Sequence, residues 1–173
     1  MQRKIFLKAV AFVFGLIALG LMSQQFFPGP PSPFEPILMT RTDMEAAVAM
    51  HEPREIESPG KIWVYNNYIL LIEKYKGIHI IDNSDPANSH NVAFIQVDGC
   101  TDLAVKDDVI FTNNAVDMIG VKVNANFSTA EVVSRNKYIL PIISSPEPWS
   151  DWYFIQMLPS NMIIVQWVPY SND

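Results

Sequence analysis

Apolar and polar positions form three successive patterns along this chain of 173 residues. An unbroken apolar run covers Ala9 to Met22, a proline-rich stretch follows, and short alternating runs begin at Gly60. Long apolar runs indicate burial in lipid or in a core, whereas short alternating runs bounded by turn residues indicate β-strands. The pattern therefore predicts an N-terminal hydrophobic helix followed by an all-β body.

Four short strands are predicted at the start of the β body. Runs rich in β-branched and aromatic residues cover 61–65, 68–73, 77–82 and 91–97. Asn66-Asn67 separates the first two runs and suits a tight turn, because Asn tolerates positive φ. Short strands joined by tight turns form one antiparallel sheet.

The pattern recurs after a shift of about forty residues. Ile69-Leu70-Leu71 matches Val109-Ile110-Phe111, and the further matches are Ile78 with Met118, Ile81 with Val121, and Val92-Ala93 with Val132-Val133. A period near forty with four strands in each unit is typical of a β-propeller blade. The sequence predicts a partial β-propeller-like array of about two four-stranded antiparallel blades within 60–173. The blades lie at about 60–99 and 100–139, and a divergent tail covers 140–173.

Two blades alone leave sheet faces uncovered, because repeat units bury their faces only against neighbours. Three alternatives follow: the chain is truncated, it closes by self-association, or the tail packs across the open side. The tail from Leu140 to Trp167 is rich in Pro, Trp and Tyr and could cover a core without regular pairing.

One segment resembles a known repeat. Residues 77–86 read Gly-Ile-His-Ile-Ile-Asp-Asn-Ser-Asp-Pro, which resembles the LVIVD repeat. The stretch 37–123 is similar to exported LVIVD-repeat proteins of the Bacteroidetes type, and 161–167 continues the similarity weakly. The resemblance implies a β-propeller of the cell envelope with no established reaction. Proteins of this family are generally longer, and many begin with a lipidated Cys that this chain lacks.

Residues 1–23 are predicted to be a signal peptide or membrane anchor. Arg3, Lys4 and Lys8 precede the apolar run, which is the order found in secretory signals. The run is shorter than the roughly 20 residues that span a bilayer, but residues 5–27 are long enough if Lys8 reaches the membrane edge. A cleaved signal and a retained anchor both remain open and are preferred over a buried core helix. Either one predicts an exported body in the cell envelope, facing the periplasm.

A Pro-rich linker over 24–41 and a short helix over 42–52 are predicted next. Five prolines between Phe26 and Pro36 favour extended polyproline geometry and disfavour pairing inside a sheet. Thr42-Asp43-Met44-Glu45 matches a capping box. The helix is expected to run from Asp43 to about His51, before Pro53.

Composition excludes several classes of function. The chain has 12 Lys+Arg against 18 Asp+Glu and a net charge of -6, which disfavours nucleic-acid binding. One cysteine excludes a disulfide framework and a zinc cluster built on thiolates. Cys100 follows Gly99 in an apolar setting, and we expect a small core residue.

For the candidate reactive residues, structural roles are preferred over catalytic or metal-binding roles. His79 is expected on a sheet face, opposite Ile78 and Ile80, and its sequence neighbours Asp82 and Ser84 are too close to form a catalytic triad with it. The oxygen-bearing side chains of Asp82, Ser84, Asp85 and Asn88 could hold Ca²⁺, but an Asp-Pro turn is preferred because the glycine and terminal Glu of a calcium loop are absent. Asp107-Asp108 is expected in a hairpin turn.

The remaining candidates are two histidines, a sequon and a group of aromatic residues. His51 is expected at a helix end, and Asn126-Phe127-Ser128 fits a glycosylation sequon that matters only in a eukaryotic secretory path. Tail aromatics are expected to pack, with a sugar- or protein-binding surface as the alternative; they are Trp149, Trp152, Tyr153, Trp167 and Tyr170. His90, like the other two histidines, has no second ligand nearby in the sequence.

The sequence thus predicts a non-catalytic, exported or membrane-anchored β-repeat protein that serves as a scaffold or binding module. No catalytic, cofactor-binding or metal-binding residue is assigned, and no cofactor is expected. The expected partners are the membrane, through the N-terminal segment, and a protein or carbohydrate, with self-association open. The alternative is a fragment of a larger propeller hydrolase or other enzyme whose site lies outside this chain.

Overall fold

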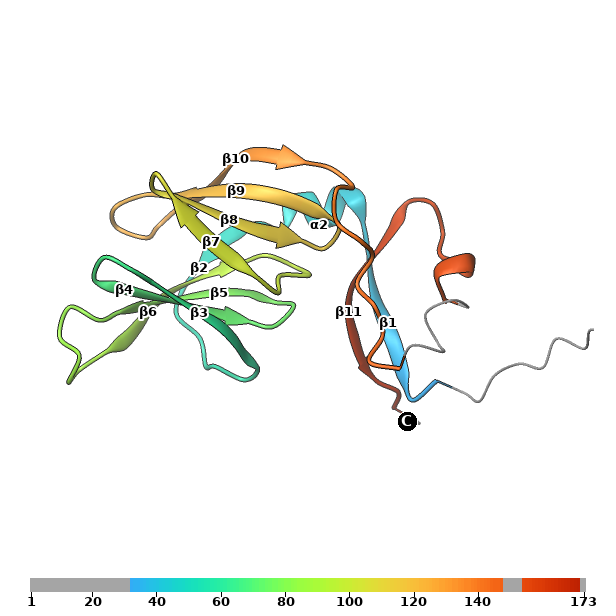
Figure 1. The fold of residues 1–173 in the computed structure, drawn as a ribbon, viewed down its shortest axis with the longest axis horizontal. Coiled ribbons are helices and arrows are strands. Elements are labelled where there is room, and N and C mark those ends of the chain that lie inside the picture. Colours follow the sequence, from blue (N-terminus) through green and yellow to red (C-terminus); the bar gives the residue numbers. More distant parts are fainter. Residues whose placement is uncertain (1–31, 148–153, 172–173) are drawn as a thin grey trace, which may run out of the picture. The chain divides into compact units, whose positions relative to one another are not determined.

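The computed structural model describes residues 32–147 and 154–171, which form mainly β-structure (Figure 1). Three antiparallel sheets account for the strands of this part of the chain. The predicted all-β class is therefore confirmed. The predicted leader over 1–23 and residues 24–31 of the predicted linker lie outside the described residues. No helix of the described residues is long and apolar enough to cross a membrane.

The first large sheet contains the four strands predicted for its region and one more. Its order is β2-β6-β5-β4-β3. The bounds are β2 Ala49–His51, β3 Pro59–Tyr65, β4 Tyr68–Glu73, β5 Gly77–Asp82 and β6 His90–Gln96. The extra strand, β2, pairs with β6 at the outer edge.

The second sheet repeats this arrangement with the order β10-β9-β8-β7. The bounds are β7 Leu103–Lys106, β8 Val109–Asn114, β9 Asp117–Val123 and β10 Ala130–Asn136. Consecutive strands pair throughout, as they do from β3 to β6. The described residues therefore contain two successive four-stranded antiparallel units, without closing them into a ring.

Tight hairpin turns begin both units, as predicted. Asn66 has φ 53° between the paired residues Tyr65 and Tyr68. Asp107 and Asp108 have φ 51° and 59°, the conformation of a type I′ turn, which matches the twist of the two strands.

The repeat is offset by one residue in its third strand, which corrects two predicted matches, Ile78 with Met118 and Ile81 with Val121. Ile78 and Val121 are both buried in the core between the large sheets, but Met118 lies on the other face of its sheet, where it lines a groove. The β4–β5 hairpin closes at Glu73 and Gly77, whereas four residues separate the paired Asn113 and Met118. A slip of one residue turns every side chain of a strand to the opposite face, so Ile78 corresponds to Ile119 rather than to Met118. For the same reason Val121 corresponds to Ile80, which is in the core, rather than to Ile81.

The two large sheets pack face to face over one apolar core. Its buried members come from both sheets and from the connection between them: Leu70, Ile72, Ile78, Ile80, Ala93, Ile95, Val97, Cys100, Leu103, Ile110, Ile119 and Val121. Gly99 in this connection has φ 78°, and a Cβ atom there would lie 2.6 Å from the backbone nitrogen of Ala115. Only glycine permits this close approach of the connection to the second sheet.

The predicted linker is partly a strand. β1 (Phe34–Thr40) pairs with β11 (Met162–Pro169) in a separate two-stranded sheet, and Pro36 lies opposite Trp167. Each strand of a two-stranded sheet has an open edge, so a proline without an N–H group is tolerated there. The predicted exclusion of this proline from a sheet is therefore wrong. The stretch 161–167, over which the similarity to the repeat proteins continues weakly, lies mostly in strand β11.

The predicted short helix is present but begins earlier and ends sooner. Helix α2 covers Arg41–Ala46, and His51 lies in strand β2. The helix cap is Thr40, whose hydroxyl oxygen accepts a hydrogen bond from the Asp43 backbone N–H at 3.1 Å. Thr42 is thus not the cap, because Thr40, two residues earlier, already bonds to Asp43 at the three-residue spacing of a capping box.

A second, smaller core joins this region to the second sheet. Buried Met44, Ala115, Val116, Ile163 and Val165 pack together. Ile142 and Ile143 of the tail pack against them. The tail therefore covers apolar surface, partly through irregular chain and partly through strand β11.

Candidate functional site

The candidate site is a groove between the outer face of the second sheet and the tail segment 140–144. Its volume is about 580 Å³, within the range of about 300–1,000 Å³ typical of ligand pockets. The lining is mainly apolar: Tyr75, Thr101, Asp102, Leu103, Ala104, Phe111, Thr112, Asn113, Ala115, Met118, Leu140, Pro141, Ile142, Ile143 and Ser144. One-residue elongation of the β8–β9 hairpin places Met118 on this face.

The tail wall of the groove is fixed by three hydrogen bonds. The Tyr138 backbone N–H donates to the Asp117 carboxylate at 3.0 Å, and the Leu140 N–H donates to the Val116 carbonyl at 3.0 Å. The Trp167 indole N–H donates to the Ile143 carbonyl at 2.8 Å. The groove is therefore preformed, since its irregular wall is bonded to strands at both ends.

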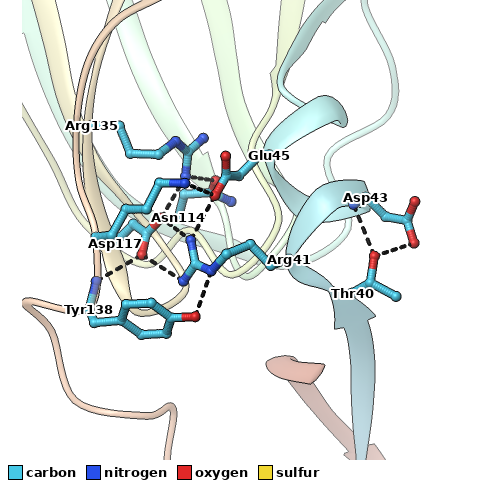
Figure 2. A network of polar contacts seen from close by, with 9 residues as sticks. Thr40, Arg41, Asp43, Glu45, Asn114, Asp117, Arg135 and Tyr138 are labelled. Carbon is cyan, nitrogen blue, oxygen red and sulfur yellow. Dashed lines mark hydrogen bonds and ion pairs between the residues drawn. The ribbon is translucent and has the colours of Figure 1, made fainter. Parts of the chain in front are cut away.

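Asp117 is the centre of the polar network that anchors this wall (Figure 2). Its side chain is fully buried and accepts hydrogen bonds from Arg41 at 2.9 Å and from Arg135 at 2.8 Å. Arg135 also donates to Asn114 at 2.9 Å. The network joins α2, β8, β9 and β10, so it positions the groove wall and does not itself line the groove.

The electrostatics of the network keep Asp117 ionised. Burial opposes ionisation, but hydrogen bonds from Arg41, from the Tyr138 N–H and from Arg135 hold the pKa of Asp117 below its ordinary value. The hydrogen bond with Asp117, together with those to Glu45 and the Tyr138 hydroxyl, raises the pKa of Arg41. Glu45 bridges Arg41 and Lys137 at 2.8 and 2.7 Å.

Polar groups at one end of the groove are already committed to the protein. The Asn113 side-chain oxygen accepts from the Thr101 and Asp102 N–H groups at 2.9 and 3.0 Å, and its nitrogen donates to the Gly99 carbonyl at 2.6 Å. The Thr112 hydroxyl donates to the Asp102 carbonyl at 2.6 Å. The polar atoms of Asn113 and Thr112 are therefore already hydrogen-bonded within the protein.

A buried Glu–His pair lies on the outer face of the first sheet. The His79 Nε2–H donates to Glu73 at 3.0 Å, and Asn91 donates to Nδ1 at 3.0 Å. Both ring nitrogens of His79 therefore have a side-chain partner. Glu73 also accepts from the backbone N–H groups of Glu57 and Ser58.

The Glu73–His79 pair joins strands β4 and β5 to the chain that precedes β3. Burial would raise the pKa of Glu73, but the bonds from His79 and from the two N–H groups lower it below its ordinary value. Glu73 and His79 have no solvent exposure and line neither of the two principal pockets. His79 was expected on the sheet face opposite Ile78 and Ile80, and the structure confirms that placement.

The Asp-Pro turn has the predicted geometry. Asp82 accepts a hydrogen bond from the Ser84 N–H at 2.8 Å, and Asp85 accepts from the Ala87 N–H at 3.0 Å. The structure does not bring Ser84 to His79. Across residues 32–147 and 154–171, no group of three or more His, Cys, Asp or Glu side chains is placed to share a metal ion.

The other candidate residues from the sequence lie at separate positions in the fold. Cys100 is buried between the large sheets, and burial raises its thiol pKa to about 12. His90 bonds to the Asn88 carbonyl in a surface turn, and Asn126 accepts from the Ser128 hydroxyl. Trp167 is buried and Tyr170 exposed, whereas Trp149, Trp152 and Tyr153 lie outside the described residues.

Sequence reasoning missed the residues that organise the site, which are Asn113, Asp117, Arg41 and Arg135. A signal was present for two of them. Asn113 and Asn114 end an apolar strand run, and Asp117 follows directly after the turn. Polar residues inside a buried strand region require hydrogen-bond partners, but the partner Arg41 lies 76 residues away from Asp117.

Comparisons with protein-family models, with curated proteins and with solved structures give no match to this chain.

Proposed function

We propose that this chain is a non-catalytic binding module of the cell envelope, exported or membrane-anchored, of the LVIVD-repeat type. Its binding surface is the groove on the second sheet. The observation that carries the proposal is the preformed groove of about 580 Å³, with its wall bonded in place and the side chains of Asn113 and Thr112 hydrogen-bonded within the protein.

The lining favours an apolar group of a protein partner over a carbohydrate. Phe111, Met118, Ile142 and Ile143 supply apolar surface. The acidic residue Asp102 is paired with Lys61. Burial of apolar side chains is the main driving force available in such a groove, at about 25 cal/mol per Å².

A fluorescence experiment tests the groove directly. The full chain is titrated with anilinonaphthalene sulfonate, an apolar probe, and is compared with Ala104→Arg, which places a long side chain on the exposed groove wall. Val133→Arg is the matched control, because Val133 is an exposed strand residue of the same sheet outside the groove. Saturable binding that weakens at least about tenfold in Ala104→Arg alone supports the proposal. Equal binding by both variants contradicts it.

Peptide selection tests the class of partner. Peptides from a random library are selected on the full chain and their affinities measured against the two arginine variants. Apolar-rich peptides that lose binding only to Ala104→Arg are the expected result. Selected peptides without apolar residues, or ones insensitive to Ala104→Arg, would count against a protein partner at this groove.

The export proposal rests on the order of basic and apolar residues over 1–23. Alkaline phosphatase, which is active only outside the bacterial cytoplasm, is fused after Asp173 and expressed in bacteria. We expect activity from the full chain and none after deletion of residues 5–22. Activity that is equal with and without that segment would overturn the export proposal and leave the groove proposal standing.

A further inference from the structure

Strand β3 forms one edge of the first large sheet, and its outer side pairs with no strand of the described residues. The strand has seven residues, and those from Pro59 to Val64 are all exposed. Ile62 and Val64 expose 63% and 65% of their surface, and Trp63 exposes 40%. Unpaired backbone groups beside exposed apolar side chains form a template on which another strand can pair.

The other edges of the two large sheets are protected against such pairing. β2 has three residues and β7 has four. β10 carries Glu131 and Arg135 and contains a register shift. Short edge strands, charges and bulges are the usual protections of a sheet edge. β3 also contains a register shift, but it lies before Ile62, so the apolar stretch 62–65 pairs regularly with β4.

The β3–β4 hairpin determines which backbone groups of β3 point outward. Tyr65 and Tyr68 are paired across a two-residue turn, and a pair in this position exchanges its hydrogen bonds within the hairpin. Backbone direction alternates along an antiparallel strand. Trp63 therefore also bonds to β4, whereas the N–H and C=O groups of Ile62 and Val64 point to the open edge.

We propose that β3 pairs antiparallel with β3 of a second copy of this chain, around a two-fold axis at Trp63. This register places Ile62 of each copy opposite Val64 of the other. Each of these pairs exchanges two backbone hydrogen bonds, because these are the residues whose N–H and C=O groups point outward. The backbone of this strand is thus complementary to itself, as a two-fold interface requires.

The side chains are complementary to themselves in the same register. Ile62 and Val64 lie on the face of the sheet that they share with Leu71 and Ile69, so two pairs of β-branched side chains form there between the copies. Trp63 lies on the other face and meets Trp63 of the second copy at a non-hydrogen-bonded position. Cα atoms at such a position approach to about 4.5 Å, which favours contact between aromatic rings.

Charge favours this register as well. Lys61 is the one charged residue of the segment 61–65 and is paired with Asp102 of its own chain. The register centred on Trp63 places Lys61 opposite Tyr65 of the second copy, so no like charges face each other. A register centred on Lys61 would place two lysines opposite each other. A second copy is favoured over an unrelated strand because one strand supplies both halves of every pair.

Sedimentation velocity of the full chain in detergent tests for the dimer. One short strand from each copy makes a small interface, so we expect a weak dimer whose population rises between about 1 µM and about 1 mM chain. Val64→Arg places a charge at the centre of the pairing and is expected to raise the dissociation constant at least about tenfold. Val133→Arg is the matched control, because Val133 is an exposed valine of the edge strand β10.

Two results of the sedimentation experiment overturn the inference. A chain that stays monomeric over the whole range leaves the edge of β3 to a strand of another protein. A dimer that is unaffected by Val64→Arg, or weakened equally by Val133→Arg, assigns the association to another surface.

A proline variant separates backbone pairing from side-chain contact. Val64→Pro removes an N–H group that points outward and no bond to β4, and proline is tolerated at such an edge position. We expect the circular dichroism spectrum of the chain to be unchanged and the dissociation constant of the dimer to rise at least about tenfold. A folded Val64→Pro chain that dimerises as well as the original chain overturns the inference.

Disulfide formation tests the register without depending on the strength of the dimer. Trp63→Cys places two thiols at facing positions, where the Cα spacing of about 4.5 Å lies within the range of about 4.4–6.8 Å that a disulfide needs. Oxidised glutathione is expected to link these chains into covalent dimers, with no contribution from the buried Cys100. Ile62→Cys is the matched control, because residue 62 faces residue 64 of the second copy. Failure of Trp63→Cys to link, or equal linking of Ile62→Cys, overturns the inference.

Discussion

The two large sheets share a scaffold and differ on their outer faces. Each sheet places one buried oxygen acceptor on its second strand, Glu73 in β4 and Asn113 in β8, forty residues apart. Each acceptor receives two consecutive backbone N–H groups from the chain just before the first strand, at residues 57–58 and 101–102. The same structural device therefore recurs with different chemistry, a carboxylate in one sheet and a neutral amide in the other.

The outer face of the first sheet, which carries the carboxylate, is closed by polar contacts, whereas that of the second sheet carries an open groove. In the first sheet, the carboxylate of Glu73 binds His79, and the side chain of Asn91 reaches the Arg54 carbonyl, so polar contacts close the face. In the second sheet, the longer β8–β9 hairpin brings Met118 to the face, and the groove stays open. The comparison teaches that the repeat fixes the core, whereas departures from the repeat produce the candidate binding surface.

The largest expected effect comes from removing the carboxylate of the first sheet. Glu73→Ala leaves a fully buried His79 and two backbone N–H groups without their acceptor, so we expect a loss of about 3–5 kcal/mol in the free energy of unfolding. Urea denaturation measures the loss. Glu73→Gln is the matched control, since it keeps an oxygen acceptor as Asn113 does, and it is expected to lose about half as much or less. Equal losses of stability in both variants would show that an uncharged oxygen acceptor cannot replace the charged carboxylate at position 73.

A smaller loss is expected at the equivalent position of the second sheet. Asn113→Ala removes a neutral acceptor and one donor, and bonds between neutral groups are about half as strong as charge-assisted ones. We expect a loss of about 2–3 kcal/mol by the same urea measurement. A loss larger than that of Glu73→Ala would break the comparison between the two sheets.

The loss of unfolding free energy at acid pH is expected to be smaller than the losses caused by these two substitutions, and carboxylates of both sheets are expected to contribute to it. The pKa of Glu73 lies below its ordinary value of 4.5, and that of Asp117 lies below 3.8. A lowered pKa stabilises the folded state fully above the ordinary value, and this stability is lost as the pH falls towards the folded-state pKa. The free energy of unfolding should therefore fall by about 1–2 kcal/mol as the pH decreases below about 4.5.

Two variants divide this acid sensitivity between the sheets. Asp117→Asn should flatten the pH dependence below about 4, and Glu73→Gln should flatten it below about 4.5, because each removes one titrating carboxylate. Chemical denaturation at several pH values measures both slopes. An unchanged slope in both variants would assign the acid sensitivity to other carboxylates.

The smallest effect concerns Cys100, which lies in the core that the two sheets share. Its thiol is buried, and its pKa is raised to about 12, so a thiol reagent should react with it only when the sheets separate. We expect Cys100 in the folded chain to be labelled more slowly than an exposed thiol, by the factor that the equilibrium of global unfolding sets. Ser58→Cys provides the exposed thiol for this comparison. Fast labelling of Cys100 in the folded protein would show that the sheets open independently.

Local sequence determined the strands, the tight turns and their recurrence. Alternating apolar residues, together with Asn66 and Asp107-Asp108 at the turns, encode hairpins through contacts between near neighbours. The order of basic and apolar residues at the N-terminus likewise supports a prediction about export from the sequence alone. Pro36 was misjudged because an edge position, which tolerates proline, depends on whether a third strand is present.

Tertiary structure alone decided the pairing of β1 with β11, the offset of the repeat and both pockets. The strands β1 and β11 are far apart in sequence, and their pairing depends on long-range packing that no short window contains. The sequence did not reveal Asp117 as the centre of the polar network, because its partners Arg41 and Arg135 come from other elements. A buried charge is stable only where distant groups converge on it, so its role emerges only when the chain is folded.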